Sequence, residues 1–510
     1  MALREANAMW CRRVLAVLVG LMALGSHSIG VVGQVPASTL IRNAVVVDGL
    51  GTPGRRVDVR LVGDRITEVG ELTRAADDRV IDAGGRTLAP GFIDTHSHHD
   101  RGLLDRRDAL AAVSQGITTI VVGQDGSSPL PLAEFFEALE ESPAAVNVAS
   151  YVGHGTLRRQ VLADDFRRPA REDELAEMRA LLRREMEAGA LGLSTGLEYD
   201  PGIYSETSEV VSLARVAGSY GGRYISHMRS EDRRVWEAVA EAVEIGRQAG
   251  IPVQISHLKL AMLPLWGEAG RLVEVLEEAR RTGVDVTADV YPYTYWQSTM
   301  RVLFPDRDFA NRASAAFALR ELVAPEGLLI VDFEPDPTYV GRTLADIAAT
   351  RATDPVTTMM DLLREAGTSG PGVVATSMDE RDVAVLLAWP FANVCSDGAL
   401  AGAHPRGFGA FPRVLGRLVR QQGVLSIEEA VRKMTSLAAA NVGLGDRGAI
   451  EVGRFADLVL FDPETIVDRA TTADPQAPSV GIDTVWLNGD VVYDDGQPTG
   501  RYTGRVIRRQ

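Results

Sequence analysis

The chain contains 510 residues, enough for one domain of roughly 250 to 350 residues with additional segments. Hydrophobic residues make up 45% and charged residues 24%, as in an ordinary globular protein. The formal net charge of -16 and the absence of a basic stripe exclude nonspecific binding to nucleic acid, whose phosphates would be repelled.

The N-terminus has the pattern of a secretory signal. Arg12 and Arg13 precede an apolar run from Val14 to Gly25, which has the length of a signal-peptide core and is too short to span a bilayer comfortably. We therefore expect residues 1–35 to be a signal peptide and the mature protein to be periplasmic or secreted, without stable membrane insertion. The alternative is a retained membrane anchor. Cleavage would leave Cys395 as the only cysteine, so no internal disulfide is expected.

Both ends of the remaining chain consist of short alternating strands separated by glycine-containing turns. We expect residues 38–90 and 446–510 to fold together into one small β-sandwich domain. Two independent β caps are the alternative, but each would have a very small core. The predicted strands are Leu40–Asp48, Asp58–Val62, Arg65–Val69, Val80–Asp82, Phe455–Phe461, Thr484–Asn488 and Val491–Tyr493.

The central segment, residues 91–445, alternates buried strands with helical stretches such as Glu172–Ala188 and Asp232–Ala249. Eight such strands predict an α/β fold, a TIM-like (β/α)8 barrel whose active site lies at the carboxyl ends of the strands. Residues 296–375 exceed what one crossover needs, and we expect a subdomain inserted between strands 7 and 8. The predicted strands end within Asp94–His98, Ile117–Gly123, Val146–Val152, Ala190–Ser194, Arg223–His227, Pro252–His257, Val284–Val290 and Asn393–Asp397.

Polar residues gather at these strand ends. His96 and His98, at i and i+2 of the first strand, point to the same face and can hold one cation together. Strands 5, 6 and 8 add His227, His257 and Asp397, so four of the eight histidines share one ring. Because neutral imidazole is a common ligand of zinc and similar metals, this ring predicts a metal site.

With these residues the sequence resembles the metal-dependent amidohydrolase superfamily and, more narrowly, the N-acyl-D-amino-acid deacylase (D-aminoacylase) family. The resemblance runs from about residue 38 to the end of the chain. It is carried by Pro90-Gly-Phe-Ile-Asp-Thr-His-Ser-His98, Leu193-Ser-Thr-Gly196, Ser226-His-Met-Arg-Ser-Glu231, Ile255-Ser-His-Leu-Lys259, Tyr291-Pro-Tyr293, Ser396-Asp-Gly398, His404-Pro-Arg406 and Gly453-Arg-Phe-Ala-Asp-Leu-Val459.

The resemblance implies hydrolysis of the amide bond of small N-acyl-D-amino acids by a metal-activated water, with release of a carboxylate and a free D-amino acid. It implies one or two divalent ions per chain, with Zn²⁺ as the expected metal. Asp397 would take a proton from the water and pass it to the leaving amine. Lys259 and Arg406 stand at family positions for the substrate α-carboxylate, with Tyr291 assisting. A homo-oligomer is compatible with the sequence.

Two other functions are weighed against this one. An isoaspartyl dipeptidase or a cyclic-amide hydrolase, like dihydroorotase or hydantoinase, would use the same barrel. Those relatives favour a carboxylated lysine on strand 4, where this chain has Glu198 and no lysine. A non-catalytic binding protein is disfavoured because the strand-8 acid, Asp397, is present.

One position departs from the family. Many D-aminoacylases carry a metal-binding cysteine in an Asn-Cys-Gly turn after strand 2, whereas this chain reads Gly123-Gln-Asp-Gly126. Either Asp125 or Glu198 could replace the thiolate, and we favour Glu198 because strand 4 carries a bridging acid or carboxylated lysine in other amidohydrolases. Alternatively, Glu198 only pairs with Arg229 or another base. Loss of a thiolate should soften the preference for zinc.

Three further side chains have structural interpretations. We expect His99 and His154 to be structural, and Glu231 to form an ion pair with Arg229 near the mouth of the site.

Overall fold

The computed structural model describes residues 38–509. The signal peptide predicted for residues 1–35 lies outside this range, so its cleavage and the resulting location stay predictions. Within residues 38–509, helices of the length and apolarity needed for a membrane crossing are absent.

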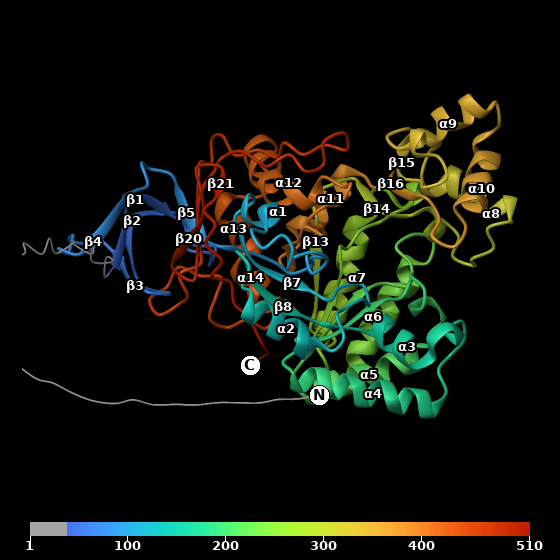
Figure 1. The fold of residues 1–510 in the computed structure, drawn as a ribbon, viewed down its shortest axis with the longest axis horizontal. Helices are drawn as coiled ribbons and strands as arrows, with labels where there is room; N and C mark the ends of the chain where they lie inside the picture. Colours follow the sequence, from blue (N-terminus) through green and yellow to red (C-terminus); the bar gives the residue numbers. More distant parts are fainter. Residues whose placement is uncertain (1–37, 510) are drawn as a thin grey trace, which may run out of the picture. The chain divides into compact units, whose positions relative to one another are not determined.

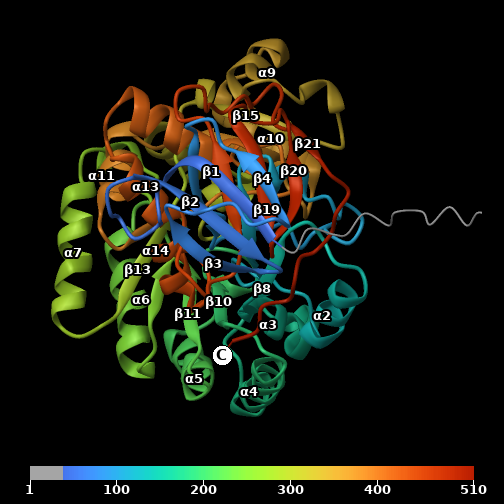
Figure 2. The ribbon, with the colours of Figure 1, turned by 90° about the vertical axis from the view of Figure 1, so that its left-hand side faces the viewer.

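The two ends of the described chain share one nine-stranded sheet, seen as blue and red strands side by side in Figures 1 and 2. Strands β5 and β18 pair antiparallel and join the N-terminal part to the C-terminal part. A common apolar core containing Leu88, Leu458 and Trp486 packs both parts together. The strands are β1 Ser38–Val46, β2 Arg55–Val62, β3 Arg65–Gly70, β4 Asp78–Asp82, β5 Thr87–Pro90, β18 Leu458–Phe461, β19 Ile482–Leu487, β20 Asp490–Asp494 and β21 Gln497–Pro498.

A two-residue turn, Asn488-Gly489, joins β19 to β20. Asn488 and Gly489 both have positive φ, 50° and 87°, as a two-residue hairpin with a primed turn requires. A Cβ on Gly489 would lie 2.0 Å from the carbonyl oxygen of Gly63. Glycine is therefore needed there both for its backbone conformation and for the close approach of the neighbouring turn.

The central part of the chain is α/β. Its strands pair in parallel as β6-β7-β8 and as β9-β10-β11-β12-β13-β17. A bridge between Ser97 and Gly398 joins the first set to the second, and so does the hydrogen bond from the Leu191 N–H to the Ser150 carbonyl. The strands are β6 Phe92–Asp94, β7 Ile117–Val122, β8 Asn147–Ser150, β9 Val152–Gly153, β10 Gly192–Gly196, β11 Arg223–His227, β12 Val253–Ile255, β13 Val286–Val290 and β17 Ala392–Val394.

Helices separate these parallel strands and pack their apolar faces on them (Figure 1). The predicted helices 172–188 and 232–249 correspond to α4 and α6. The helices are α1 Leu110–Val113, α2 Leu132–Glu141, α3 His154–Leu162, α4 Glu172–Glu187, α5 Thr207–Ser219, α6 Val235–Ala249, α7 Ala269–Arg281, α11 Glu380–Ala388, α12 Arg406–Arg413, α13 Ile427–Met434 and α14 Ser436–Val442.

The segment between β13 and β17 forms its own small sheet and apolar core, in yellow and orange in Figure 1. Strand β16 pairs antiparallel with β14 and β15, and the core includes Met300, Ile330 and Leu362. The elements are β14 Tyr295–Thr299, α8 Arg312–Phe317, β15 Leu328–Asp332, α9 Leu344–Arg351, α10 Pro355–Ala366 and β16 Gly372–Thr376.

Several strands end earlier than the sequence predicts. Strand β6 ends at Asp94, so His96 and His98 follow the strand instead of lying within it. Likewise His257 and Asp397 follow β12 and β17, both with positive φ (34° and 48°). These side chains are directed by the turns after the strands, not by strand alternation.

Candidate active site

The residues after the parallel strands line a cavity of about 740 Å³. His98, Asp125 and Asp397 lie on its wall, together with His227 and His257 from the neighbouring strands. The segment between β13 and β17 contributes further lining residues, which are Trp296, Gln297, Ser298, Thr299, Val302, Leu303, Leu322, Val331, Asp332 and Gly372.

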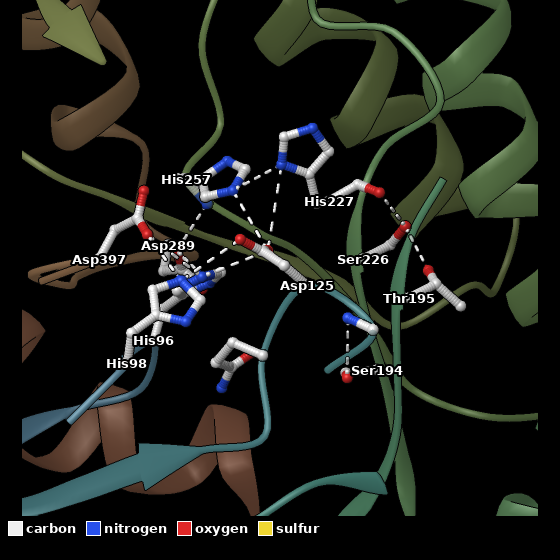
Figure 3. Close-up of polar contacts among 12 residues, drawn as sticks. His96, His98, Asp125, Ser194, Thr195, Ser226, His227, His257, Asp289 and Asp397 are labelled. Atoms are coloured by element: carbon white, nitrogen blue, oxygen red, sulfur yellow. Dashed lines mark hydrogen bonds and ion pairs between the residues drawn. The ribbon is translucent and has the colours of Figure 1, made fainter. Parts of the chain in front are cut away.

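Two carboxylates lie between the histidines (Figure 3). Oδ1 of Asp397 lies 3.5 Å from Nε2 of His96 and 3.2 Å from Nε2 of His98. Oδ1 of Asp125 lies 3.4 Å from Nε2 of both His96 and His257, and its Oδ2 lies 3.3 Å from Nε2 of His98. The five side chains therefore direct their donor atoms toward one another.

These separations fit a divalent cation. Metal–ligand bonds of about 2.0–2.1 Å in a tetrahedral site place neighbouring donor atoms roughly 3.3 Å apart. Both ring nitrogens of His96 and Oδ1 of Asp125 and of Asp397 are buried without a hydrogen-bond partner among the described residues. Since buried polar atoms normally have partners, this group of donors has the chemistry of a metal site.

His227 joins the cluster through one ring nitrogen. Its Nδ1 lies 3.0 Å from Nε2 of His257 and 4.0 Å from Oδ1 of Asp125. Its Nε2 faces away and lies 2.9 Å from Oε2 of Glu198. Glu198 is thus behind the ring of His227, on the side opposite to the centre of the cluster.

The geometry favours Asp125 over Glu198 as the carboxylate among the histidines, and the sequence-based preference for Glu198 is corrected accordingly. Asp125 follows β7 in a turn with φ of 53°, which directs its carboxylate back over the cluster. Gly126 allows this because a Cβ there would lie 2.8 Å from the backbone nitrogen of Gly196. Glu198 contacts the cluster through His227, so it pairs with another base, as the alternative interpretation allowed, and Arg229 pairs with Glu241 instead.

The charges inside the cluster explain its pKa shifts. Burial lowers the pKa of His98, but hydrogen bonds and charge from Asp125 and Asp397 outweigh it and raise the pKa to about 9. For Asp125, burial raises the pKa, but the charges of His96 and His257 hold it well below its usual range. The cluster is therefore an environment that strongly favours added positive charge.

Arg406, at the start of α12, is the direct partner of Asp397. Its NH1 lies 2.6 Å from Oδ2 of Asp397, and its guanidinium carbon lies 4.8 Å from the ring centre of Tyr291. Burial raises the pKa of Asp397, but the charge of Arg406, followed by those of His257 and His96, holds it well below its usual range. The hydroxyl of Tyr291 is buried without a hydrogen-bond partner among the described residues.

Lys259 lies in the same cavity but already has a partner. Its Nζ lies 2.6 Å from Oε1 of Glu231 and 2.7 Å from Nδ1 of His257. The predicted pair of Arg229 with Glu231 is wrong, because Arg229 pairs with Glu241 at 2.9 Å. Sequence reasoning missed Glu231 as part of the site, although its place in Ser226-His-Met-Arg-Ser-Glu231 was a signal for it.

His99 and His154 stay outside the cluster of donors. His99 contacts the hydroxyl of Ser97, and burial, with the charge of His98, lowers its pKa to about 3. His154 lies 2.8 Å from Oε1 of Glu209 in a separate buried network with Arg158.

Comparison with known proteins gives the family. Residues 79–324 and 302–493 match the model of the amidohydrolase family. The chain is 37% identical over 500 residues to a D-aminoacylase of Alcaligenes xylosoxydans xylosoxydans, covering 93% of this chain and 98% of the relative. It is 39% identical over 494 residues to an N-acyl-D-glutamate deacylase of the same organism, covering 92% and 96%.

Solved structures agree with the sequence comparison. A D-aminoacylase with a binuclear metal centre, activated by one metal and attenuated by a second, superposes with a TM-score of 0.83 at 36% identity, covering 92% of this chain and 99% of that one. An N-acyl-D-glutamate deacylase from Bordetella bronchiseptica, complexed with zinc and a phosphonate mimic of the tetrahedral intermediate, gives 0.83 at 35%, with the same coverage. The fold is thus that of an amidohydrolase. The chain belongs to the amidohydrolase family, in its D-aminoacylase branch.

Proposed function

We propose that this protein hydrolyses the amide bond of N-acyl-D-amino acids and releases a carboxylate and a free D-amino acid. The observation that carries the proposal is the cluster of His96, His98, Asp125, His257 and Asp397 with donor atoms 3.2–3.5 Å apart, next to a buried arginine. The D-configuration of the substrate is supported by the relatives, which are named for D-amino acids.

The metal ligands in this proposal are His96, His98, Asp125, His227 and His257, and the carboxylate of Asp397 faces them. One or two divalent ions bind per chain, and Zn²⁺ is the expected metal. The binuclear centre of one solved relative supports the number, and the zinc in the other supports the metal. When bound, such a metal polarises the amide carbonyl and activates the attacking water. Because all the donors are nitrogen or oxygen, Mn²⁺ or Co²⁺ are also suited to the site.

Asp397 moves the proton. Arg406 lowers the pKa of the Asp397 carboxyl group and so keeps it ionised, and Oδ1 of Asp397 faces the histidine cluster. During the reaction a carbon–oxygen bond forms, the amide carbon–nitrogen bond breaks, and Asp397 carries the proton of the water to the leaving nitrogen. The amine departs in its protonated form.

The substrate α-carboxylate binds on the other side of Asp397. Arg406 donates one N–H to Asp397 and has four further N–H donors in a planar group that suits a carboxylate. The unpartnered hydroxyl of Tyr291 can donate to the same anion. Lys259 supplies a second cation on the cavity wall.

The parts of the chain are proposed to be a signal peptide (1–35), a β-sandwich domain formed by both ends (38–90 and 446–510) and a (β/α)8 barrel (91–445) with a subdomain at about 296–375. Closure of the barrel is supported by the bridge between Ser97 and Gly398, with β8 and β9 as one interrupted strand. Export to the periplasm or medium is supported by Arg12, Arg13 and the apolar run that follows.

The test is a hydrolysis screen of N-acetyl-D- against N-acetyl-L-amino acids with metal-loaded protein and parallel metal analysis. We expect hydrolysis of D-isomers that requires one or two bound divalent ions. Hydrolysis of L-isomers alone, or activity that survives complete metal removal, would refute the proposal.

A further inference from the structure

The cavity wall has two sides that are separated by the cluster of donors. One side consists of residues that follow β12, β13 and β17, among them Lys259, Tyr291 and Arg406. The other side consists of residues that follow β7, β9 and β10. In the order of the parallel strands, β11 separates the two groups at one end, and β6 separates them at the other through the bridge between Ser97 and Gly398.

A substrate bound as proposed extends over both sides. In an N-acyl amino acid, the α-carboxylate and the acyl chain lie on opposite sides of the amide bond. The proposed function places the α-carboxylate at Arg406 and Lys259 and the amide carbonyl at the cluster. The acyl chain then extends toward the residues that follow β7, β9 and β10, which we call the acyl side of the cavity.

The acyl side has a floor of small residues. Gly126, Gly155 and Gly196 line it, and Ser127 and Thr156 add short polar side chains. The backbone segments of this floor lie close together, since a Cβ on Gly155 would lie 2.8 Å from the carbonyl oxygen of Gly126. The whole cavity, about 740 Å³, is in the range of sites that hold ligands larger than one N-acetyl amino acid.

Two exposed arginines line the cavity at the acyl side. Arg101 lies in the segment after β6, the strand that pairs with β7, and Arg159 lies on α3, after β9. Among the described residues, neither guanidinium has a carboxylate within ion-pair distance. Arg159 donates one hydrogen bond, to the carbonyl oxygen of Asp200 at 2.7 Å, and its charge is left without a counter-ion.

The other charges of the wall are compensated or lie elsewhere. The remaining lysine and arginine of the wall each pair with a buried carboxylate. The carboxylate of Asp200 is paired with Arg307 at 3.0 Å, so its charge is already compensated. Asp232 follows β11, and Asp332 ends β15 of the inserted segment, so neither belongs to the acyl side. An anionic group of a ligand would be the first counter-ion of the two free arginines.

We propose that this protein prefers acyl groups that end in a carboxylate, such as succinyl, and that Arg101 and Arg159 determine this specificity. The proposal rests on the proposed function and specifies its substrate. The planar N–H donors of a guanidinium suit a carboxylate. In the reaction, the oxygen of water bonds to the acyl carbon, the carbon–nitrogen bond breaks, and the proton of the water goes to the leaving nitrogen. The products are a dicarboxylic acid and a free D-amino acid.

The experiment compares the N-succinyl and N-succinamoyl derivatives of one D-amino acid, which differ only in a terminal carboxylate or amide. The D-amino acid is the one that the metal-loaded full chain hydrolyses fastest as its N-acetyl derivative. We expect kcat/KM at low salt to be about fivefold or more higher for the succinyl derivative. This ratio should fall toward one in about 1 M NaCl, because salt screens exposed charges.

Substitutions assign the preference to the two arginines. Arg101→Gln and Arg159→Gln should each lower the ratio of the two kcat/KM values, and the double variant should bring it near one. Arg159→Lys should keep most of the ratio, because it keeps the charge. The matched control is Arg167→Gln, which should leave the ratio unchanged. The guanidinium carbons of Arg159 and Arg167 lie 5.4 and 5.7 Å from the centre of the Phe166 ring, but Arg167 does not line the cavity.

A ratio near one in the unmodified protein would overturn the proposal, as would an unchanged ratio in the double variant or an equal loss in Arg167→Gln. A displaced loop or a loss of stability lowers both rates and leaves their ratio unchanged. If circular dichroism shows that the double variant does not fold, the two single variants decide. Hydrolysis of N-acetyl derivatives without a succinyl preference refutes this proposal alone, whereas absent hydrolysis of every N-acyl-D-amino acid refutes the proposed function with it.

Discussion

Replacement of Arg406 by methionine removes the positive charge that it offers to Asp397 and to the substrate carboxylate. Arg406 is 7% exposed, and its guanidinium lies 2.6 Å from Asp397, next to the ring of Tyr291. Methionine keeps an unbranched apolar side chain beside the ring but removes the charge. A hydrogen-bonded charge pair with the substrate carboxylate contributes about 2 kcal/mol, which corresponds to a roughly 30-fold rise in KM.

The same substitution removes the counter-ion of Asp397 and would also change kcat. Comparing an N-acetyl-D-amino acid with its carboxamide separates the two effects, because the change at Asp397 acts on both substrates. We expect kcat/KM of Arg406→Met to fall roughly 30-fold further for the acid than for the carboxamide. Equal losses on both substrates would refute the assignment of Arg406 to the substrate carboxylate.

Four further substitutions test other parts of the account. Asp397→Asn should retain metal but lower kcat by roughly a hundred- to ten-thousandfold, and near-normal turnover would remove its role as proton carrier. Asp125→Asn should lower the metal content measured by elemental analysis more than Glu198→Gln does; the reverse order would restore Glu198 as the ligand. Burial raises the pKa of Glu209, but its bonds to His154 and Arg158 dominate and lower it from 4.5 to about 2. Glu209→Gln should therefore cost about 3 kcal/mol of unfolding free energy at pH 7. Because the folded-state pKa is depressed, this difference should shrink as the pH falls from about 4.5 to about 2; a constant difference in urea unfolding would contradict it.

The ring of histidines could be predicted because parallel strands place their carboxyl ends at one edge. His96, His98, His227, His257 and Asp397 each follow or end a strand that hydrophobic patterning identifies. The amidohydrolase family was likewise visible in those motifs, and the comparisons confirm it. The order of the strands followed from the alternation of strand and helix alone.

The choice between Asp125 and Glu198 could not be made from the sequence. It depends on the left-handed backbone at Asp125 and on which nitrogen of His227 faces the cluster. Strand periodicity predicts neither the backbone conformation of Asp125 nor the orientation of the His227 ring, because both are determined in the turns after the strands. For the same reason the partner of Glu231 was missed: it pairs with Lys259, which follows the neighbouring strand β12.

The most direct measurement is a crystal structure of the zinc-loaded protein with anomalous scattering to locate the metal. The account predicts zinc about 2.0–2.2 Å from a carboxylate oxygen of Asp125 and from ring nitrogens of the surrounding histidines. Zinc coordinated by Glu198 with Asp125 turned away, or bound outside this ring, would contradict it.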